Sequence, residues 1–358
     1  MADDSLALLL SLAEVSRDLA LRVLPELDSV DPLEALLRLL GSQSWDGDYL
    51  TSLLEIWIQA GLPKTGASHW LWRIVQPKRS IEELAYLFYA LESLDGSVDA
   101  ERFFRACDRV CPADHPEPRW IQVEGGTFTM GSPAEETWRL DDEVQHDVSL
   151  STYWIAVTPV TNGEYGVFDP QHVAERFEHR GGPIPERDLS SHPVVNVSWW
   201  EAYLYSRWVR ADLPTEAQWE CACRAGTRTP FSFGQGITTD QANYDGRFPS
   251  GAGEVGENRA RTTPVGSLPA NGWGLHDMHG NVYEWCVDQY GPYGSGPSAD
   301  PRGIQGTLSK SRPRVLRGGC WLDSARYLRA AGRVARDPKL RFLHMGFRLA
   351  RDRFEPSR

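Results

Sequence analysis

The chain has 358 residues, 41% of them hydrophobic, which is enough for two domains with apolar cores. Its 37 Lys and Arg residues face 49 Asp and Glu residues, and the net charge of -12 argues against nucleic-acid binding by the whole protein. No uncharged apolar stretch is long enough to span a membrane. Asp3 and Asp4 precede the first apolar run, where a signal peptide needs positive charge, so we expect a cytoplasmic protein.

Residues 1–112 are predicted to form a small all-α domain, because apolar residues recur there at helical spacing. Ser80 and Glu83 form a capping box before one such apolar face. Other helices are expected at residues 6–13, 32–41, 48–61 and 99–110. Three prolines between Cys111 and Pro118 end the pattern. The domain carries no catalytic constellation, so we expect an adaptor that contacts another protein.

From Arg119 to Arg358 the pattern changes to short strands separated by Gly, Pro, Asn and Asp. Strands are expected at residues 120–123, 148–150 and 154–157. Ser198 with Glu201 predicts a helix that ends near Arg210, and Thr215 predicts the start of the next helix. The predicted fold class is therefore α+β for residues 119–358, preceded by the all-α domain.

The six cysteines show no zinc-site spacing, because Cys221 and Cys223 are only two residues apart and no histidine pair completes a set. We therefore expect reduced, mostly buried thiols. The six are Cys107, Cys111, Cys221, Cys223, Cys286 and Cys320.

Six segments of the second domain resemble, in the same order, the formylglycine-generating-enzyme type of C-type lectin fold, also called the sulfatase-modifying factor family. Together they span about 230 residues. The segments are GGTFTMGS from Gly125, DEVQHDVSLSTYWIAVTPVTNGEY from Asp142, HPVVNVSWWEAYLYSRWV from His192, LPTEAQWECACRAG from Leu213, NGWGLHDMHGNVYEWCVD from Asn271, and RVLRGGCWLDSARYLRAAGR with MGFRLAR between Arg314 and Arg351.

The resemblance does not extend to the catalytic residues of that family. Its oxidases bind copper through two cysteines five residues apart, and those positions here are Asp323 and Leu328. Cys320 lies nearby but has no partner five residues on. The related sulfoxide synthases need three iron-binding histidines, whereas the N-terminal domain has only His69. We therefore expect no enzyme activity and neither copper nor iron, with a formylglycine-generating or sulfoxide-synthase-like oxidoreductase as the alternative.

A third branch of the family resembles this chain more closely, namely the variable proteins of diversity-generating retroelements. Their C-terminal segment has the frame found here between residues 314 and 348, and their diversified positions hold residues reachable from an N-N-C codon. Every corresponding residue here meets that condition. These residues are Leu322, Asp323, Ser324, Tyr327, Gly332, Val334, Leu340, Phe342, Leu343 and His344.

The resemblance thus implies a hypervariable ligand-binding site, to which we add Trp321 as an apolar anchor. We expect these residues on one exposed face, with an unknown ligand that is a protein, and a signalling or effector partner for residues 1–112. The frame between them should be buried or hydrogen-bonded. Its members are Arg326, Leu328, Arg329, Ala331, Arg333, Arg341, Gly346 and Phe347. The alternatives are ordinary loop residues in a relative that is not diversified, or a constitutive calcium-dependent sugar-binding lectin.

The segment from Asp277 to Glu284 resembles the family's calcium loop, which implies a structural calcium ion. A turn held by Asn281 without a metal is the alternative, and a second calcium loop would fall near Asn243 and Tyr244. The expected ligands are the carboxylates and carbonyls of Asp277, Gly280, Val282 and Glu284.

Basic residues accumulate at the end of the chain. Residues 300–358 hold fifteen Lys and Arg against five Asp and Glu. This excess indicates either a basic binding face or structural arginines inside a motif, and the acidic whole favours structural arginines.

Overall fold

The computed structural model describes residues 72, 75, 80–95, 98–174, 186–249, 254–294, 296–302 and 312–352. The chain divides into two compact units between Val110 and Cys111. This division lies next to the proline-rich segment at which the sequence places a domain boundary. The helices expected within residues 6–61 lie outside the described residues.

Two helices are described in the first unit, and both begin at the predicted caps. α6 (Ile81–Asp95) follows Ser80, whose backbone N–H donates to Glu83 while its hydroxyl accepts from the N–H of Glu83. α7 (Ala100–Ala106) starts after Asp99, whose carboxylate accepts from the backbone N–H of the third residue on. It is shorter than the predicted helix at 99–110, because the chain reverses into the left-handed region at Asp108. The apolar face of α6 is buried, as its helical spacing predicts.

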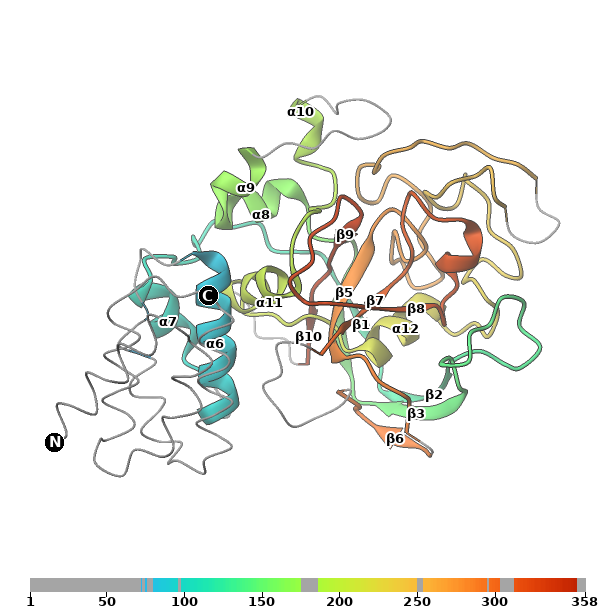
Figure 1. Ribbon diagram of the computed structural model, residues 1–358, viewed down its shortest axis with the longest axis horizontal. Helices are drawn as coiled ribbons and strands as arrows, with labels where there is room; N and C mark the ends of the chain where they lie inside the picture. Colours follow the sequence, from blue (N-terminus) through green and yellow to red (C-terminus); the bar gives the residue numbers. More distant parts are fainter. Residues whose placement is uncertain are drawn as a thin grey trace, which may run out of the picture. The chain divides into compact units, whose positions relative to one another are not determined.

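Three small sheets organise the second unit (Figure 1). One has the order β1-β4-β10, so both ends of this unit meet in a single antiparallel sheet. The others have the orders β2-β3-β6 and β8-β7-β5-β9. The strands are β1 (Trp120–Val123), β2 (Gly126–Met130), β3 (His146–Leu150), β4 (Tyr153–Ala156), β5 (Tyr283–Gln289), β6 (Ser298–Ala299), β7 (Arg314–Arg317), β8 (Arg333–Arg336), β9 (Met345–Gly346) and β10 (Ala350–Arg351).

The predicted strand at 120–123 is found as β1, and those at 148–150 and 154–157 are found within two residues as β3 and β4. The longer helices begin at the predicted capping boxes, which Ser198 forms with Glu201 and Thr215 forms with Gln218. The helices of this unit are α8 (Asn162–Phe168), α9 (Pro170–Ala174), α10 (Glu186–Leu189), α11 (Trp199–Trp208) and α12 (Glu216–Arg224), with a 3-10 helix η2 (Ala325–Leu328).

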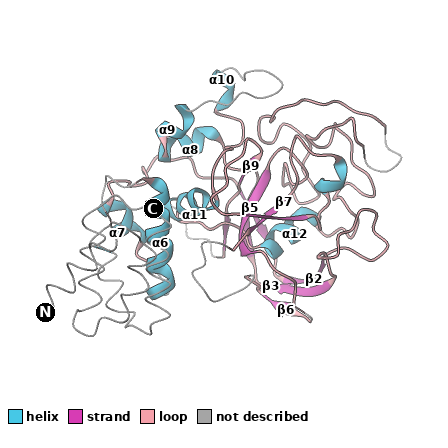
Figure 2. Cartoon of the chain, in the orientation of Figure 1, coloured by secondary structure: helices cyan, strands magenta, loops and turns pink. Residues whose placement is uncertain are grey.

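Helix α12 lies at the centre of the main core. It contacts β2, β3, β5 and β7, and its Trp219 is fully buried among Ile155, Cys286 and Val315. Loops make up much of this unit, as Figure 2 shows, so large aromatic side chains fill the irregular space between its short strands. The family fold expected from the sequence, α+β with small sheets and two main helices, is the one observed.

The six cysteines are all free, and all except Cys111 and Cys221 are buried, as the sequence predicts. None of the described helices combines the length and the apolar composition that a membrane span requires.

Candidate ligand-binding face

The C-terminal segment starts with a double glycine at the end of β7. Gly318 and Gly319 have φ angles of 95° and 72°, which favour glycine. A Cβ atom on Gly319 would also lie 2.8 Å from the Leu328 side chain and 3.0 Å from the Tyr327 carbonyl oxygen. The pair therefore allows η2 to pack closely on the end of β7, which fixes where the following residues emerge.

Ten of the eleven residues that the sequence assigns to the binding face reach solvent. Four are exposed, namely Leu322, Tyr327, Leu340 and Phe342, with fractions between 36% and 41%. Six more are half-buried, namely Asp323, Ser324, Gly332, Val334, Leu343 and His344. The prediction is wrong for Trp321, which is only 2% exposed because its indole packs inward and donates to the Leu343 carbonyl.

Tyr283 of β5 connects the two ends of this face. Its ring lies 6.2 Å from that of His344, its backbone N–H donates to the His344 carbonyl at 2.8 Å, and its hydroxyl lies near the Asp323 carboxylate. His344 in turn stacks on Phe342 at 5.4 Å. The turn after β7 and the loop before β9 therefore meet over Tyr283, a contact that no local sequence signal could have indicated.

Most of the predicted frame is buried, and three of its four arginines pair with acidic residues. Arg329 binds Glu143 through two N–H groups at 2.6 and 2.7 Å, and Arg333 binds Glu216 in the same way at 2.7 and 2.8 Å. Bidentate pairs of this kind hold a guanidinium in one orientation. Arg341 is more exposed but bonds to Glu201. Leu328, Ala331, Gly346 and Phe347 are buried.

Arg326 departs from the predicted frame. Its side chain is exposed, and its guanidinium lies 4.4 Å from the centre of the Tyr327 ring, to whose hydroxyl it also donates. It therefore belongs to the face rather than to the frame.

The positions that hold the catalytic cysteines in related oxidases contain no pair of thiols. Leu328 is fully buried, and Asp323 accepts hydrogen bonds at one oxygen from the Cys320 N–H at 3.1 Å and the Cys320 thiol at 3.3 Å. Burial raises the pKa of Asp323, although hydrogen bonds from Tyr283 and Cys320 oppose the rise. Burial also holds the pKa of Cys320 well above its usual range, so this sulfur stays a protonated thiol.

The segment expected to hold calcium is stabilised by protein groups instead. Both oxygens of Glu284 bind Arg348, at 2.6 and 2.7 Å, and one of them also accepts from the Trp219 indole at 2.7 Å. Asp277 accepts from the Gly266 N–H at 2.8 Å, and burial raises its pKa to about 6. Within the described residues no three His, Cys, Asp or Glu side chains gather as a metal site.

The sequence suggested Asp277, Gly280, Val282 and Glu284 as calcium ligands. Because both carboxylate oxygens of Glu284 already bind Arg348, Glu284 does not fit this role. The second expected loop is also bridged by protein groups, because the Asn243 amide donates to the Arg261 carbonyl and to Asn281.

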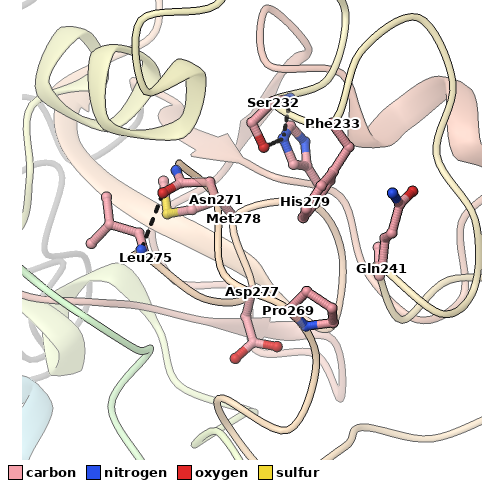
Figure 3. A pocket seen from close by; sticks show the side chains of 10 residues that line it. Ser232, Phe233, Gln241, Pro269, Asn271, Leu275, Asp277, Met278 and His279 are labelled. Atoms are coloured by element: carbon pink, nitrogen blue, oxygen red, sulfur yellow. Dashed lines mark hydrogen bonds between the residues drawn. The ribbon is translucent and has the colours of Figure 1, made fainter. Parts of the chain in front are cut away.

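A small cavity borders this segment and is drawn in Figure 3. His279 lies at its wall and accepts at Nε2 from the backbone N–H of Ser232 at 3.0 Å, while its Nδ1 donates to the Leu328 carbonyl. Burial lowers the pKa of His279 to about 4, so the imidazole is neutral. The volume is about 10 Å³, room for one water molecule rather than a ligand.

A larger cavity of about 170 Å³ lies at the start of α12 and was not anticipated from the sequence. Its wall includes His146, Glu216, Asp288, Tyr293 and Arg333. Glu216 is already bound by Arg333 and Arg317, and the Asp288 carboxylate accepts from the Glu216 N–H at 2.7 Å. The polar groups around this cavity therefore mainly hold α12 against β5, β7 and β8.

Comparison with known proteins agrees with this architecture. The chain is 35% identical over 260 residues to the serine/threonine-protein kinase pkn1 of Chlamydia caviae, covering 66% of this chain and 39% of the kinase, so it spans about two fifths of that relative. It is 33% identical over 283 residues to the formylglycine-generating enzyme of Streptomyces coelicolor, covering 65% of this chain and 88% of the enzyme.

Among solved structures, the chain resembles variable protein 1 of Treponema denticola with a TM-score of 0.52 and 25% identity, covering 68% of this chain and 98% of that one. The model of the sulfatase-modifying factor enzyme 1-like domain matches residues 108–353, which include every strand and the whole candidate face. The chain therefore belongs to the family of proteins with a sulfatase-modifying factor enzyme 1-like domain.

Proposed function

We propose that this protein is a non-catalytic ligand-binding protein whose lectin-type scaffold displays a site diversified as in the variable proteins of diversity-generating retroelements. The observation that carries the proposal is the division of the segment 314–348 into exposed and buried positions. Ten of its eleven assigned face residues reach solvent, whereas most of the predicted frame residues between them, with the exception of Arg326, are buried or paired. A buried position does not tolerate such variety, because a large-to-small change there costs about 2–5 kcal/mol.

The genomic neighbourhood tests the diversification directly. We expect a reverse-transcriptase gene nearby, with a near-repeat of codons 314–348 that differs mainly where the repeat carries adenine. If the locus has neither feature and the segment is invariant among strains, the site is a fixed one and a constitutive lectin becomes the better description.

The absence of catalysis rests on Asp323 and Leu328, which replace the thiols, and on the buried Cys320. Incubation with copper, oxygen and a sulfatase-type peptide should give no formylglycine by mass spectrometry. An active enzyme of the family, run in parallel, is the control. Product above the protein-free background would instead support the oxidoreductase alternative.

The two parts of the chain are assigned different partners. We expect the face to bind a protein in the cytoplasm, and residues 1–112 to act as an adaptor for a signalling or effector protein. Limited proteolysis between Cys111 and Pro118 should release two protected fragments if the adaptor is a separate unit. A chain that resists cleavage there, and whose halves do not fold alone, would argue against this adaptor.

A further inference from the structure

Several exposed hydrophobic side chains of the second unit belong to the candidate face or to loops bonded to it, whereas Val167, Val255 and Trp273 belong to other segments. Besides Leu322, Tyr327, Leu340 and Phe342, the loops at 131–145 and 240–249 expose several more. These are Trp138 at 37%, Leu140 at 49%, Val144 at 50% and Phe248 at 57%. Exposed apolar side chains that gather around one element mark an interaction site more often than isolated residues do.

The loop at 131–145 is bound directly to η2. One guanidinium, that of Arg329, donates to the Trp138 carbonyl at 2.9 Å and to the Arg326 carbonyl at 3.0 Å, so Trp138 and Arg326 lie side by side. The ion pairs from Arg329 to Glu136 and Glu143 hold the same loop. Trp138 has a φ angle of 67°, a conformation that is rare for a bulky residue and that these bonds maintain.

The loop at 240–249 lies against the same turn. The Phe248 carbonyl accepts from the Ala325 N–H at 3.2 Å, and the Asp323 carbonyl accepts from the Asp245 N–H at 2.8 Å. Phe248 and Trp138 therefore both adjoin η2, the helix that carries Arg326 and Tyr327.

Two exposed arginines of this surface are available to anions, although the loop at 131–145 also exposes Glu135 and Asp141. The buried arginines of the C-terminal segment are matched by Glu136, Glu143, Glu216, Glu220 and Glu284. Arg326 and Arg336, by contrast, are exposed and form no ion pair within the described part of the chain. Stacking on Tyr327 leaves the Arg326 guanidinium oriented to receive a carboxylate.

We infer that the ligand-binding face extends beyond the diversified segment, and that Trp138, Phe248 and Arg326 form a constant rim that takes a protein segment carrying a carboxylate beside an apolar side chain. The inference rests on the proposed function, since it adds fixed contacts to the variable ones. A protein fits better than a nucleic acid, because a net charge of -12 repels a polyanion.

The test is selection of random peptides from a displayed library on the full chain, followed by binding measurements with labelled copies of the selected peptides. We expect the selected sequences to be enriched in Asp or Glu next to an aromatic or aliphatic residue. The variants Trp138→Gly and Phe248→Ala should each weaken binding about tenfold, because truncating an anchor residue costs more than about 1 kcal/mol. Arg326→Glu should abolish binding, and Arg326→Lys should retain part of it.

The variant Trp273→Ala is the matched control, because Trp273 is 36% exposed but lies outside the rim and the segment. It should leave binding unchanged. Trp138→Gly separates binding from folding, because glycine adopts a φ of 67° without strain and should keep the melting temperature within a few degrees.

Each result decides between the two proposals. If the selected peptides lack acidic residues, the rim is contradicted and the proposed function stands. The same holds if their affinity is unchanged by the variants at Trp138, Phe248 and Arg326 but falls in Tyr327→Ala. If the peptide affinity is also unchanged in Tyr327→Ala and Phe342→Ala, both the rim and the proposed function are contradicted. A library that yields no binder, or Arg326-dependent capture of single-stranded oligonucleotides at equal affinity, also overturns the rim.

Discussion

At the scale of single residues, buried ion pairs decide which arginines are structural. Arg317 is fully buried and binds Glu220 at 2.5 Å, Glu216 at 3.1 Å and two backbone carbonyls. Although burial opposes the ionisation of Glu220, Arg224 and Arg317 hold its pKa below the usual range. The network joins β7 to α12, so its loss should affect the whole unit.

Glu220→Gln is expected to lower the free energy of unfolding by about 3–5 kcal/mol, because it leaves Arg317 and Arg224 buried with too little negative charge. Urea denaturation measures the change. The control is Glu257→Gln, which removes a 63% exposed partner of Arg259 and should cost less than about 1 kcal/mol. Equal losses in the two variants would contradict this account of the network.

Asp288 gives a prediction about pH. Burial, with the nearby charge of Glu216, raises its pKa from 3.8 to about 7. The folded protein therefore holds this proton between about pH 4 and 7 while the unfolded chain releases it, so stability from this group falls as the pH rises through that window. Asp288→Asn has no carboxyl at this position, so its stability does not fall for this reason as the pH rises. The stability of the variant relative to the natural protein should therefore increase from pH 4 to 7, by at most about 4 kcal/mol.

Urea denaturation of both proteins at several pH values checks this expectation. Asparagine keeps an oxygen that can accept from the Glu216 N–H, so the helix start should be preserved. A stability difference that stays constant between pH 4 and 7 would show that Asp288 does not carry a raised pKa.

At the scale of elements, capping boxes fix where the helices begin. Ser198 and Glu201 satisfy each other's backbone N–H groups at the start of α11, and Thr215 and Gln218 do the same at α12. These two helices supply much of the buried aromatic surface, including Trp199 and Trp219. Their starts therefore position the core on which the candidate face rests.

Ser198→Ala should lower the free energy of unfolding by about 1 kcal/mol, because a buried N-cap loses its acceptor oxygen. Thermal denaturation followed by circular dichroism measures it. The exposed Ser267 provides the comparison, and Ser267→Ala should change stability by no more than about 0.5 kcal/mol. No difference between the two alanine variants would mean that the box does not stabilise α11.

At the scale of the whole molecule, the second unit is joined by ion pairs between segments that are far apart in sequence. Arg329 reaches across 193 residues to Glu136, Arg333 across 117 to Glu216, and Arg348 across 64 to Glu284. The last of these contacts occupies Glu284, one of the two carboxylates expected to bind calcium. We therefore propose that the unit is held together without calcium.

Removal of calcium tests this proposal. Addition of EGTA should leave the melting temperature unchanged, and added calcium should not raise it, because a ligand that binds only the folded state would shift the transition. A calcium-dependent rise would show that the segment from Asp277 to Glu284 rearranges to hold the ion. Glu284→Gln should nevertheless destabilise the protein with or without EGTA, since it weakens the pair with Arg348.

Local sequence patterns were sufficient to predict the starts of α6, α7, α11 and α12 and to indicate the family. A capping box joins residues three apart, so Ser80, Ser198 and Thr215 could be read without any tertiary information. The order of the six motifs indicated the family fold. The resemblance to diversified proteins also predicted that the ten face residues other than Trp321 would reach solvent, and four of them are exposed and six half-buried.

Which side chains are buried and which carboxylate each arginine binds could not be predicted without the tertiary structure. Trp321 is buried because Leu343 folds back to accept from its indole, and Arg326 is exposed because Arg329 takes the carboxylates nearby. Glu284 of β5 binds Arg348, a residue 64 positions away in the loop between β9 and β10. Such outcomes depend on contacts between distant segments, whose pairing local sequence patterns do not encode.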